Sequence, residues 1–340
     1  MRAAVLREYR RPLVLTDLPV PEPRGAGDVL VRLGGAGVCA TDLHSIDGLM
    51  EPAGVVLPRV LGHENAGWVE AVGDGVSTFR VGDAVIVYPA HSCGLCVACR
   101  RGNDMQCIRG EFTGLSRDGG FAEYLLTTER ALIKLSSGLD PADVAPHADA
   151  GLTAFHAVRR VAHVARPGST SVVVGIGGVG HIALQLLRSL GSGSVVAVEN
   201  DARRRALAAD LGADHVVEGA NAVEAVQDLT GGRGADLVID FVGSDATHAG
   251  SMRALARGGT YSVVGYGGTL RADSTLLVTN EHTVMANLVG TWVDLFELLE
   301  LHGAGAIVLR TERYRLEEVN DVLERLRQGD VIGRAVLVPG

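Results

Sequence analysis

The sequence has very little lysine and no long apolar run. Lys134 is the only lysine among its 31 basic residues, which leaves little scope for chemistry through a lysine Schiff base. No stretch of about 18 consecutive apolar residues occurs, and the first ten residues carry charges where a signal peptide has its apolar stretch. We therefore expect a protein of the cytoplasm that has no membrane partner.

Positive charge is also scarce. The 340 residues carry a formal net charge of -9, and the longest basic run is Arg203-Arg204-Arg205. This balance argues against the basic footprint that nucleic-acid binding requires, so we expect a small molecule as the partner. A chain of this length usually exceeds one hydrophobic core, which predicts more than one domain.

The residues that are present divide the chain into three parts. Residues 1–150 contain short strands broken by glycine and proline, which predicts an irregular, mostly β domain. Residues 151–290 alternate apolar strands with helical segments, a pattern typical of βαβ units around a parallel sheet. In residues 291–340 an apolar helical stripe precedes a final strand, and we expect this part to return to the first domain.

Four of the five cysteines lie within residues 91–108. Cys93, Cys96, Cys99 and Cys107 follow the spacing Cys-x2-Cys-x2-Cys-x7-Cys. Thiols this dense in a cytosolic chain stay reduced, so the spacing indicates a structural zinc ion, with a redox or disulfide role as the alternative. Four sulfur ligands leave no position for a substrate, so we expect this lobe to have a structural role.

A Gly-x-Gly-x-x-Gly motif follows the first strand of the second part and opens a helix, and Glu199 ends the next strand. This arrangement predicts a dinucleotide site with the pyrophosphate at the helix N-terminus. Because the Glu199 carboxylate would repel a 2'-phosphate, NAD is favoured over NADP, although residues 203–205 offer a phosphate partner. The cofactor-binding turn consists of Gly175, Gly177, Gly178, Val179 and Gly180.

The fifth cysteine, Cys39, lies in GVCATDLHS, and His63 lies in LGHENAG. Taken alone, both are more often buried core residues than ligands. Together, however, the motifs of this chain resemble those of the zinc-containing medium-chain alcohol dehydrogenases, and of the bacterial secondary-alcohol enzymes among them. The motifs occur in the order Cys-x-Thr-Asp-x-His, Gly-His-Glu, the four-cysteine lobe and the glycine motif. The resemblance covers essentially the whole chain. It implies an α/β fold class, with a GroES-like catalytic domain and a Rossmann dinucleotide-binding domain.

The resemblance also implies a second, catalytic zinc ion. Its ligands are Cys39, His63 and, where many relatives have cysteine, Asp149, which leaves a fourth position for a substrate oxygen. Asp149 is also placed to cap the helix that begins near Ala150. Glu64 has two interpretations: it transiently displaces water from the metal, or it is the partner of a buried arginine.

Further roles follow from the same resemblance. Asp42 orients the His63 ring, and Thr41 passes the proton of the substrate hydroxyl through the nicotinamide ribose to His44 near solvent. The local alternatives are a turn-stabilising Asp-Thr pair and a surface histidine. Three residues contact the cofactor: Arg204 at the adenosine ribose, Thr153 beside the nicotinamide and Arg334 on the pyrophosphate.

We therefore expect an NAD-dependent oxidoreductase with two zinc ions per chain that interconverts alcohols, above all secondary ones, and ketones or aldehydes. The alternatives are a polyol or other hydroxy-compound dehydrogenase, a zinc-free quinone or enoyl reductase of the same fold, and a dinucleotide-binding protein without activity. A short-chain dehydrogenase is excluded, because no tyrosine has a lysine four residues later.

Two expectations concern surfaces rather than motifs. Tyr88, Leu115 and Trp292 are candidates for the wall of the substrate pocket. A strand near residues 284–290 is expected to pair across a homodimer, with a homotetramer as the alternative.

Overall fold

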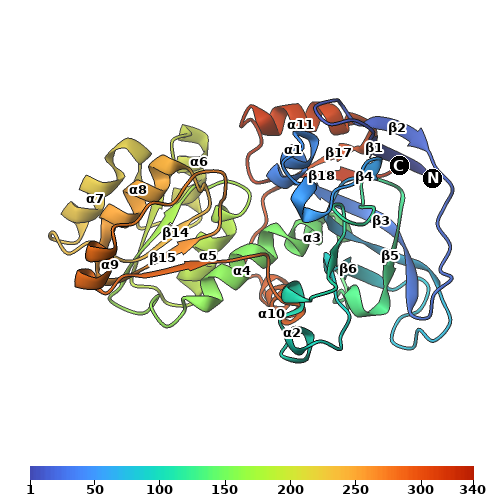
Figure 1. Ribbon diagram of the computed structural model, residues 1–340, viewed down its shortest axis with the longest axis horizontal. Coiled ribbons are helices and arrows are strands. Elements are labelled where there is room, and N and C mark those ends of the chain that lie inside the picture. The colour runs from blue at the N-terminus through green and yellow to red at the C-terminus, as the bar shows by residue number, and fades with distance from the viewer. The chain divides into compact units, whose positions relative to one another are not determined.

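The computed structural model describes all 340 residues and forms two compact units (Figure 1). Unit 1 consists of Met1–Leu152, Thr291–Ala304 and Leu309–Gly340, and unit 2 of Thr153–Gly290 and Gly305–Val308. No helix in the structure combines the length and the apolar character that a membrane span needs.

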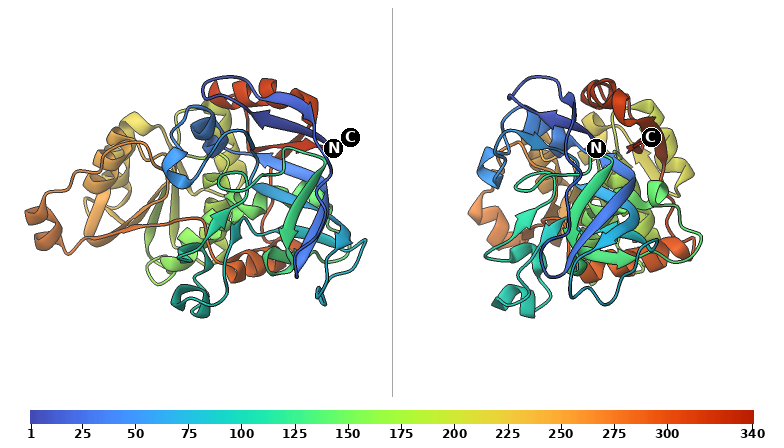
Figure 2. Two further views of the ribbon diagram at one scale, coloured as in Figure 1. Left: turned by 45° about the vertical axis from the view of Figure 1, so that its right-hand side comes forward. Right: turned by 90° about the vertical axis from the view of Figure 1, so that its right-hand side faces the viewer.

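Unit 1 is built mainly of antiparallel strands. Its seven-stranded sheet has the order β10-β6-β5-β3-β18-β17, with β9 also paired to β3, and a second sheet has the order β2-β1-β4. The right-hand view of Figure 2 shows β3 beside β9 in the curved main sheet. The strands are β1 (Arg2–Leu6), β2 (Val14–Asp17), β3 (Asp28–Val38), β4 (Arg59–Val60), β5 (Glu64–Val72), β6 (Ala84–Val87), β7 (Ala90–His91), β8 (Glu111–Phe112), β9 (Tyr124–Thr128), β10 (Leu132–Lys134), β17 (Thr311–Arg315) and β18 (Arg334–Val338).

The helices of unit 1 are short and connect these strands. α11 buries Val319, Val322 and Leu323 on one face, which is the apolar stripe expected from the sequence. These residues join apolar side chains of β1 and β18 in one core. The helices are α1 (Ala40–Ile46), α2 (Val97–Arg100), α3 (Pro141–Val144), α4 (Ala150–Arg160, which continues into unit 2), α10 (Trp292–Gly303) and α11 (Val319–Arg327), with 3-10 turns at Glu51–Ala53, Asp104–Gln106, Glu129–Ala131, Ala145–Ala148 and Leu316–Glu318.

The C-terminal strand lies inside the main sheet of unit 1. β18 pairs antiparallel with β3 and parallel with β17. The last residues of the chain therefore pack between strands that come from its beginning and its end. Both chain ends lie close together in this unit (Figures 1 and 2).

Unit 2 has a parallel sheet of six strands in the order β13-β12-β11-β14-β15-β16. All five residues of β11 are buried, as expected for a strand covered on both faces. α5 packs on β11 and β12, and α8 packs on β14 and β15 (Figure 1). This confirms the expected α/β fold with a Rossmann-type sheet. Its elements are β11 (Thr170–Val174), α5 (Gly180–Ser189), β12 (Ser194–Val198), α6 (Ala202–Asp210), β13 (His215–Val217), a 3-10 turn (Gly219–Asn221), α7 (Ala222–Leu229), β14 (Ala235–Asp240), α8 (Asp245–Ala254), β15 (Leu255–Val263), α9 (Ser274–Asn280) and β16 (Thr283–Ala286).

The last strand of this sheet is shorter than the sequence indicates. β16 ends at Ala286, whereas the apolar pattern predicts a strand near residues 284–290. The Asn287 side chain donates hydrogen bonds to Ser262 and Val263, and Val289 has a φ of 49°. Because an extended strand cannot include such a φ, the chain turns away after Ala286.

Candidate metal centres and cofactor site

The four cysteines of the lobe bring their sulfur atoms together. The Sγ atoms of Cys96 and Cys99 are 3.4 Å apart, and the Cys93–Cys99 and Cys96–Cys107 distances are 4.0 Å. None of the four forms a disulfide. Around a tetrahedral zinc ion with bonds of about 2.3 Å, the sulfurs lie about 3.8 Å apart. The geometry fits a closed site of four sulfur ligands.

Hydrogen bonds prepare this lobe for negative charge on sulfur. The backbone N–H groups of Leu95 and Cys96 donate to the Cys93 sulfur and lower the pKa of that thiol to about 5. Arg130 braces the lobe from outside, donating from Nε to Ser92 at 3.0 Å and from Nη2 to Asp104 at 2.7 Å. The lobe therefore combines a Cys93 thiol of lowered pKa with neighbouring side chains that hydrogen bonds to Arg130 hold in place.

A second group of ligand-type residues lies at the ends of three other elements. Cys39 precedes α1, His63 precedes β5, and Asp149 precedes α4. The Asp149 Oδ2 atom is 3.4 Å from His63 Nε2 and 3.7 Å from Cys39 Sγ. The structure thus brings together the three ligands expected for the second zinc ion, and Glu64 lies beside them, with ligand atoms all within 4.8 Å of one another.

The His63 ring is held between two carboxylates. Its Nδ1 atom is 3.4 Å from Asp42 Oδ1, and Asp42 accepts N–H bonds from Cys39 at 2.9 Å and Gly62 at 3.3 Å. Burial alone lowers the pKa of His63, but the charge of Asp42 and hydrogen bonds to Asp149, Asp42 and Cys39 outweigh it and raise the pKa well above its usual value. The centre therefore stabilises a cation between these side chains.

Glu64 pairs with a buried arginine. Its Oε1 atom accepts from the Arg334 guanidinium and from the N–H of Ala150 at 3.1 Å. The Glu64 side chain is fully buried and that of Arg334 is 5% exposed. Burial raises the pKa of Glu64, and Arg334 opposes this effect. Of the two interpretations of Glu64, the structure shows the arginine pair, whereas the expected contact of Arg334 with a pyrophosphate stays a prediction.

Thr41 and His44 lie one turn apart on α1, and both are partly buried. Burial lowers the pKa of His44; Asp47 opposes this shift and Arg327 adds to it. The imidazole is therefore neutral near pH 7 and able to accept a proton. The proton relay through these two residues stays a prediction.

The glycine turn in unit 2 is shaped by one positive φ and one close approach. Gly175 has a φ of 85°, and a Cβ at Gly180 would lie 1.8 Å from the carbonyl oxygen of Gly175. A Cβ at Gly177 would meet nothing within 4 Å. Gly175 and Gly180 are therefore required by the fold, whereas Gly177 leaves open space at the start of α5. Open space beside a helix N-terminus fits a pyrophosphate.

Glu199 is fixed against this turn. Its carboxylate accepts N–H bonds from Ile176 at 2.8 Å, Asn200 at 2.8 Å and Asp201 at 3.0 Å. A carboxylate offers about four acceptor positions, so one remains for a ribose hydroxyl. Its charge lies at the carboxyl end of β12, where the expected adenosine ribose would bind.

The three arginines after Glu199 differ in their surroundings. Arg203 pairs with Asp201 at 2.7 Å, and Arg205 donates to the carbonyl oxygens of Glu199 and Asn200. Arg204 is partly buried in the first turn of α6, and Thr153 is partly buried in α4. The expected contacts of Arg204 and Thr153 with the cofactor stay predictions.

Sequence reasoning missed His181, which directly follows the glycine turn. Its Nδ1 lies 2.9 Å from the carbonyl oxygen of Gly177, and the side chain is fully buried. The available signal was its place four residues after Gly177, because the N–H at that spacing in a helical turn donates to the earlier carbonyl, as it does here at 3.2 Å. Of the candidates for the pocket wall, Tyr88 and Leu115 are buried, and Trp292 stacks on Phe296 with ring centroids 5.9 Å apart.

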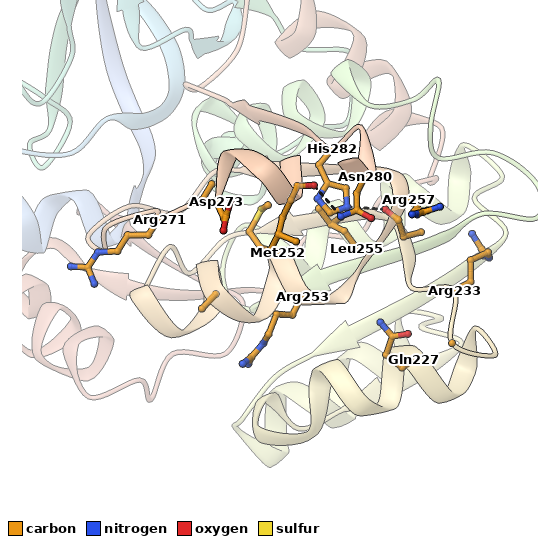
Figure 3. Close-up of a pocket in the computed structure, with 15 residues that line it drawn as sticks. Gln227, Arg233, Met252, Arg253, Leu255, Arg257, Arg271, Asp273, Asn280 and His282 are labelled. Carbon is orange, nitrogen blue, oxygen red and sulfur yellow. Dashed lines mark hydrogen bonds between the residues drawn. The ribbon is translucent and has the colours of Figure 1, made fainter. Parts of the chain in front are cut away.

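A cavity of about 870 Å³ lies elsewhere in unit 2, near the amino ends of β14, β15 and β16 (Figure 3). None of the expected site residues lines it, and Asp273 is its only carboxylate. Figure 3 shows its arginines spread around the group rather than gathered at one point. Arg253 lies in the last turn of α8, where a cation suits the helix dipole, and Arg233 pairs with Asp236. The residues that line this cavity do not form a catalytic or metal-binding group.

Comparison with known proteins covers both units. Residues 25–137 match the alcohol dehydrogenase GroES-like domain, and residues 178–303 match the zinc-binding dehydrogenase family. The alcohol dehydrogenase structure of Aeropyrum pernix is similar, with a TM-score of 0.97 and 44% identity over 100% of both chains. An NAD-dependent alcohol dehydrogenase of Sulfurisphaera tokodaii is 36% identical over 100% of both chains. A D-arabinose 1-dehydrogenase (NADP(+)) of Saccharolobus solfataricus is 36% identical over 99% of this chain and 97% of that protein.

The glycine turn generates a paired test. Gly177→Ala should weaken NAD binding about tenfold, because the added methyl group enters the space left for the pyrophosphate, with little change in thermal stability. Gly180→Ala should instead lower the free energy of unfolding by about 1–3 kcal/mol, because its methyl group meets the Gly175 carbonyl. Calorimetric titration with NAD and thermal melts separate the two effects. Equal behaviour of the two variants would argue against the assignment of Gly177.

Proposed function

This chain belongs to the zinc-binding, GroES-like alcohol dehydrogenases, and on that premise we propose that it oxidises secondary alcohols to ketones with NAD and catalyses the reverse reduction. The observation that carries the proposal is the approach of Asp149 Oδ2 to both His63 Nε2 and Cys39 Sγ. A zinc-free quinone or enoyl reductase needs no such set. A site with three protein ligands leaves one position for the substrate oxygen.

The residues fit the groups that the reaction requires. Cys39, His63 and Asp149 would hold the catalytic zinc ion, which when bound lowers the pKa of an alcohol hydroxyl toward neutrality. Asp42 orients the His63 ring through Nδ1, so that Nε2 faces the centre. The glycine turn and Glu199 would hold the dinucleotide whose nicotinamide accepts the hydride.

The proton of the alcohol needs its own route. The Thr41 hydroxyl would accept it, and the neutral His44 ring, one turn along α1, would take it onward to solvent. The lowered pKa of His44 keeps that ring unprotonated near neutral pH. The buried Glu64–Arg334 pair stays outside this route and holds the strands that carry the centre.

A sugar or other polyhydroxy compound is the second candidate substrate. The observation that favours it is the relative from Saccharolobus solfataricus, which is named for D-arabinose and NADP(+). In this chain, Glu199 argues against NADP, because its charge opposes a 2'-phosphate. We therefore keep NAD as the cofactor, and a sugar is the second candidate substrate after a simple secondary alcohol.

We propose that the protein acts in the cytoplasm and assembles into a homodimer or homotetramer, and the surface of unit 2 supports the assembly. β16 pairs only with β15, so its other edge has free backbone groups. Near it, Leu276, Val278 and Leu288 are 58%, 75% and 65% exposed. A second copy of the chain, pairing along β16, would cover this edge and these side chains.

The test of the function is a substrate panel. Secondary alcohols, primary alcohols and sugars are supplied with NAD, and NADH formation is followed by its near-ultraviolet absorbance. Secondary alcohols should give the highest kcat/KM. A preference for a sugar would select the second candidate, and no NADH with any of them would contradict the proposed function.

Two cysteine variants separate the two metal sites. Cys39→Ala should lower alcohol-dependent NADH formation at least ~100-fold, because it removes a ligand from the site that binds substrate, while NAD binding survives. Cys96→Ser should lose one zinc ion and thermal stability, because metal binding there is coupled to folding of the lobe. Zinc analysis and activity per folded protein give the comparison. The assignment would be reversed if Cys96→Ser lost activity without losing stability while Cys39→Ala stayed active.

Cofactor choice is tested at Glu199. Glu199→Ser removes the charge that opposes a 2'-phosphate, so the ratio of kcat/KM for NADP to that for NAD should rise by a factor on the order of 10 to 100. Asp210→Ser, at the exposed C-terminal end of α6, the helix that follows Glu199, is the matched control and should leave the ratio unchanged. A wild-type protein that prefers NADP would contradict the ribose assignment.

The proton route is tested by pH. His44→Ala should slow alcohol oxidation about tenfold near neutral pH, above the lowered pKa of His44, and less at alkaline pH, where hydroxide replaces the base. Small buffer bases should restore part of the rate. In the wild type, activity supported by the relay should fall as the pH drops through the pKa of His44, because the protonated ring accepts no proton. An unchanged pH profile without buffer rescue would leave His44 outside the relay.

A further inference from the structure

Unit 2 contains a buried hydrogen-bonded network that none of the roles described above uses. The Tyr261 hydroxyl donates to Asp240 Oδ2 at 2.9 Å, and His248 Nδ1 lies 2.6 Å from the same hydroxyl. All three side chains are buried. Because the single phenolic proton points to the carboxylate, the phenolic oxygen accepts from a protonated Nδ1 of His248. The order of donation is therefore His248 to Tyr261 to Asp240.

Asp240 connects this network to two loops. Its Oδ1 atom accepts the N–H groups of Val242 at 2.8 Å and Gly243 at 3.0 Å. Its carbonyl oxygen accepts those of Val264 and Gly265, both at 2.9 Å. One residue at the end of β14 therefore fixes the backbone that follows β14 and the backbone that follows β15.

The two loops pack against each other and against the glycine turn. A Cβ at Gly243 would lie 2.2 Å from Gly265, so the two backbones are in direct contact. A Cβ at Gly175 would lie 2.6 Å from Val242 Cγ2. A displacement of Asp240 would therefore be passed to both loops, whereas the neighbouring turn meets them through the Val242 side chain and is fixed separately by the Ile176 N–H bond to Glu199.

The position of the loops relates them to the cofactor. The strand order reverses between β11 and β14, and ligands of such sheets bind at the carboxyl ends of the strands at this point. The glycine turn and Glu199 lie on the β11–β12 side and suit the pyrophosphate and the adenosine ribose. The nicotinamide half then lies toward β14 and β15, beside the loops that Asp240 fixes.

We propose that Tyr261 and His248 are positioning residues for the nicotinamide half of the dinucleotide. They hold the Asp240 carboxylate, and through it residues 241–243 and 264–265, in the arrangement that binds this half. The inference rests on the proposed dinucleotide function, and it adds a group of residues outside the glycine motif that sets the affinity for one half of the cofactor only.

The test uses two ligands that differ in the nicotinamide. NADH contains it and ADP-ribose lacks it, while both contain the adenosine ribose and the pyrophosphate. Tyr261→Phe removes one oxygen atom, so Asp240 loses a donor and the two loops lose their fixed position. NADH should bind about fivefold to tenfold more weakly, whereas the dissociation constant of ADP-ribose should change less than about twofold. Calorimetric titration of the full-length protein measures both.

Tyr314→Phe is the matched control. It also removes a phenolic hydroxyl that has a hydrogen-bond partner, here Arg325, but it lies in unit 1. Both ligands should bind to it as to the wild type. His248→Leu is a second variant, which leaves the bond between Tyr261 and Asp240 intact. It should also weaken the binding of NADH but not of ADP-ribose, by a smaller factor than Tyr261→Phe. If Tyr261→Phe does not fold, His248→Leu decides.

The outcomes are distinct. Weaker binding of NADH alone supports the proposal. Equal loss for NADH and ADP-ribose, or a lower melting temperature with no change for either ligand, would show a purely structural network and overturn it. If the wild-type protein bound neither ligand, the dinucleotide function itself would fail, and this inference with it.

Discussion

The arrangement of the metal centre in unit 1 depends on the buried ion pair between Glu64 and Arg334. The pair joins β5 to β18 across β3, and this crossing is open only because Gly37 has no side chain: a Cβ there would lie 1.9 Å from Glu64 Oε2. The same carboxylate accepts the N–H of Ala150, the residue after Asp149. One buried charge thus fixes three distant segments, and loss of either partner would leave the other uncompensated at a cost of about 3–5 kcal/mol.

The two candidate zinc centres handle charge in different ways. Around His63, the acidic groups of Cys39, Asp42, Glu64 and Asp149 outnumber the one fixed cation, Arg334. The raised pKa of His63 follows from the charge of Asp42 and from hydrogen bonds to Asp149, Asp42 and Cys39, which favour a proton where a divalent ion fits. In the lobe, the backbone N–H groups of Leu95 and Cys96 and, to a smaller extent, the exposed Arg109 guanidinium stabilise the charge on Cys93. The first centre therefore favours positive charge through buried carboxylates, whereas the lobe favours negative charge on sulfur through backbone N–H groups and an exposed arginine.

Motifs confined to a short stretch of sequence were the most predictable features. The four lobe cysteines span residues 93–107, so their spacing alone indicates their convergence, and the glycine turn is equally local. The partner of Glu64 is 270 residues away, and no pattern in the sequence selects Arg334 over other arginines. Asp240 was missed for a similar reason, because its partners belong to α8 and β15 and its role depends on the backbone of two loops. The predicted end of the strand near residue 290 was wrong, because an apolar run does not reveal the φ of Val289.

The position of β18 has a consequence for the synthesis of the protein. The strand lies in the interior of the main sheet of unit 1, between β3 and β17, yet it is made of the last residues of the chain. While the ribosome is still adding residues, all of unit 2 except Gly305–Val308 has already emerged, whereas β3 still exposes the edge that β18 will cover. Unit 2 is therefore able to fold largely during translation, but the Glu64 carboxylate has no counter-charge until Arg334 leaves the exit tunnel. The nascent chain therefore gains the framework for its dinucleotide before it gains a complete metal centre.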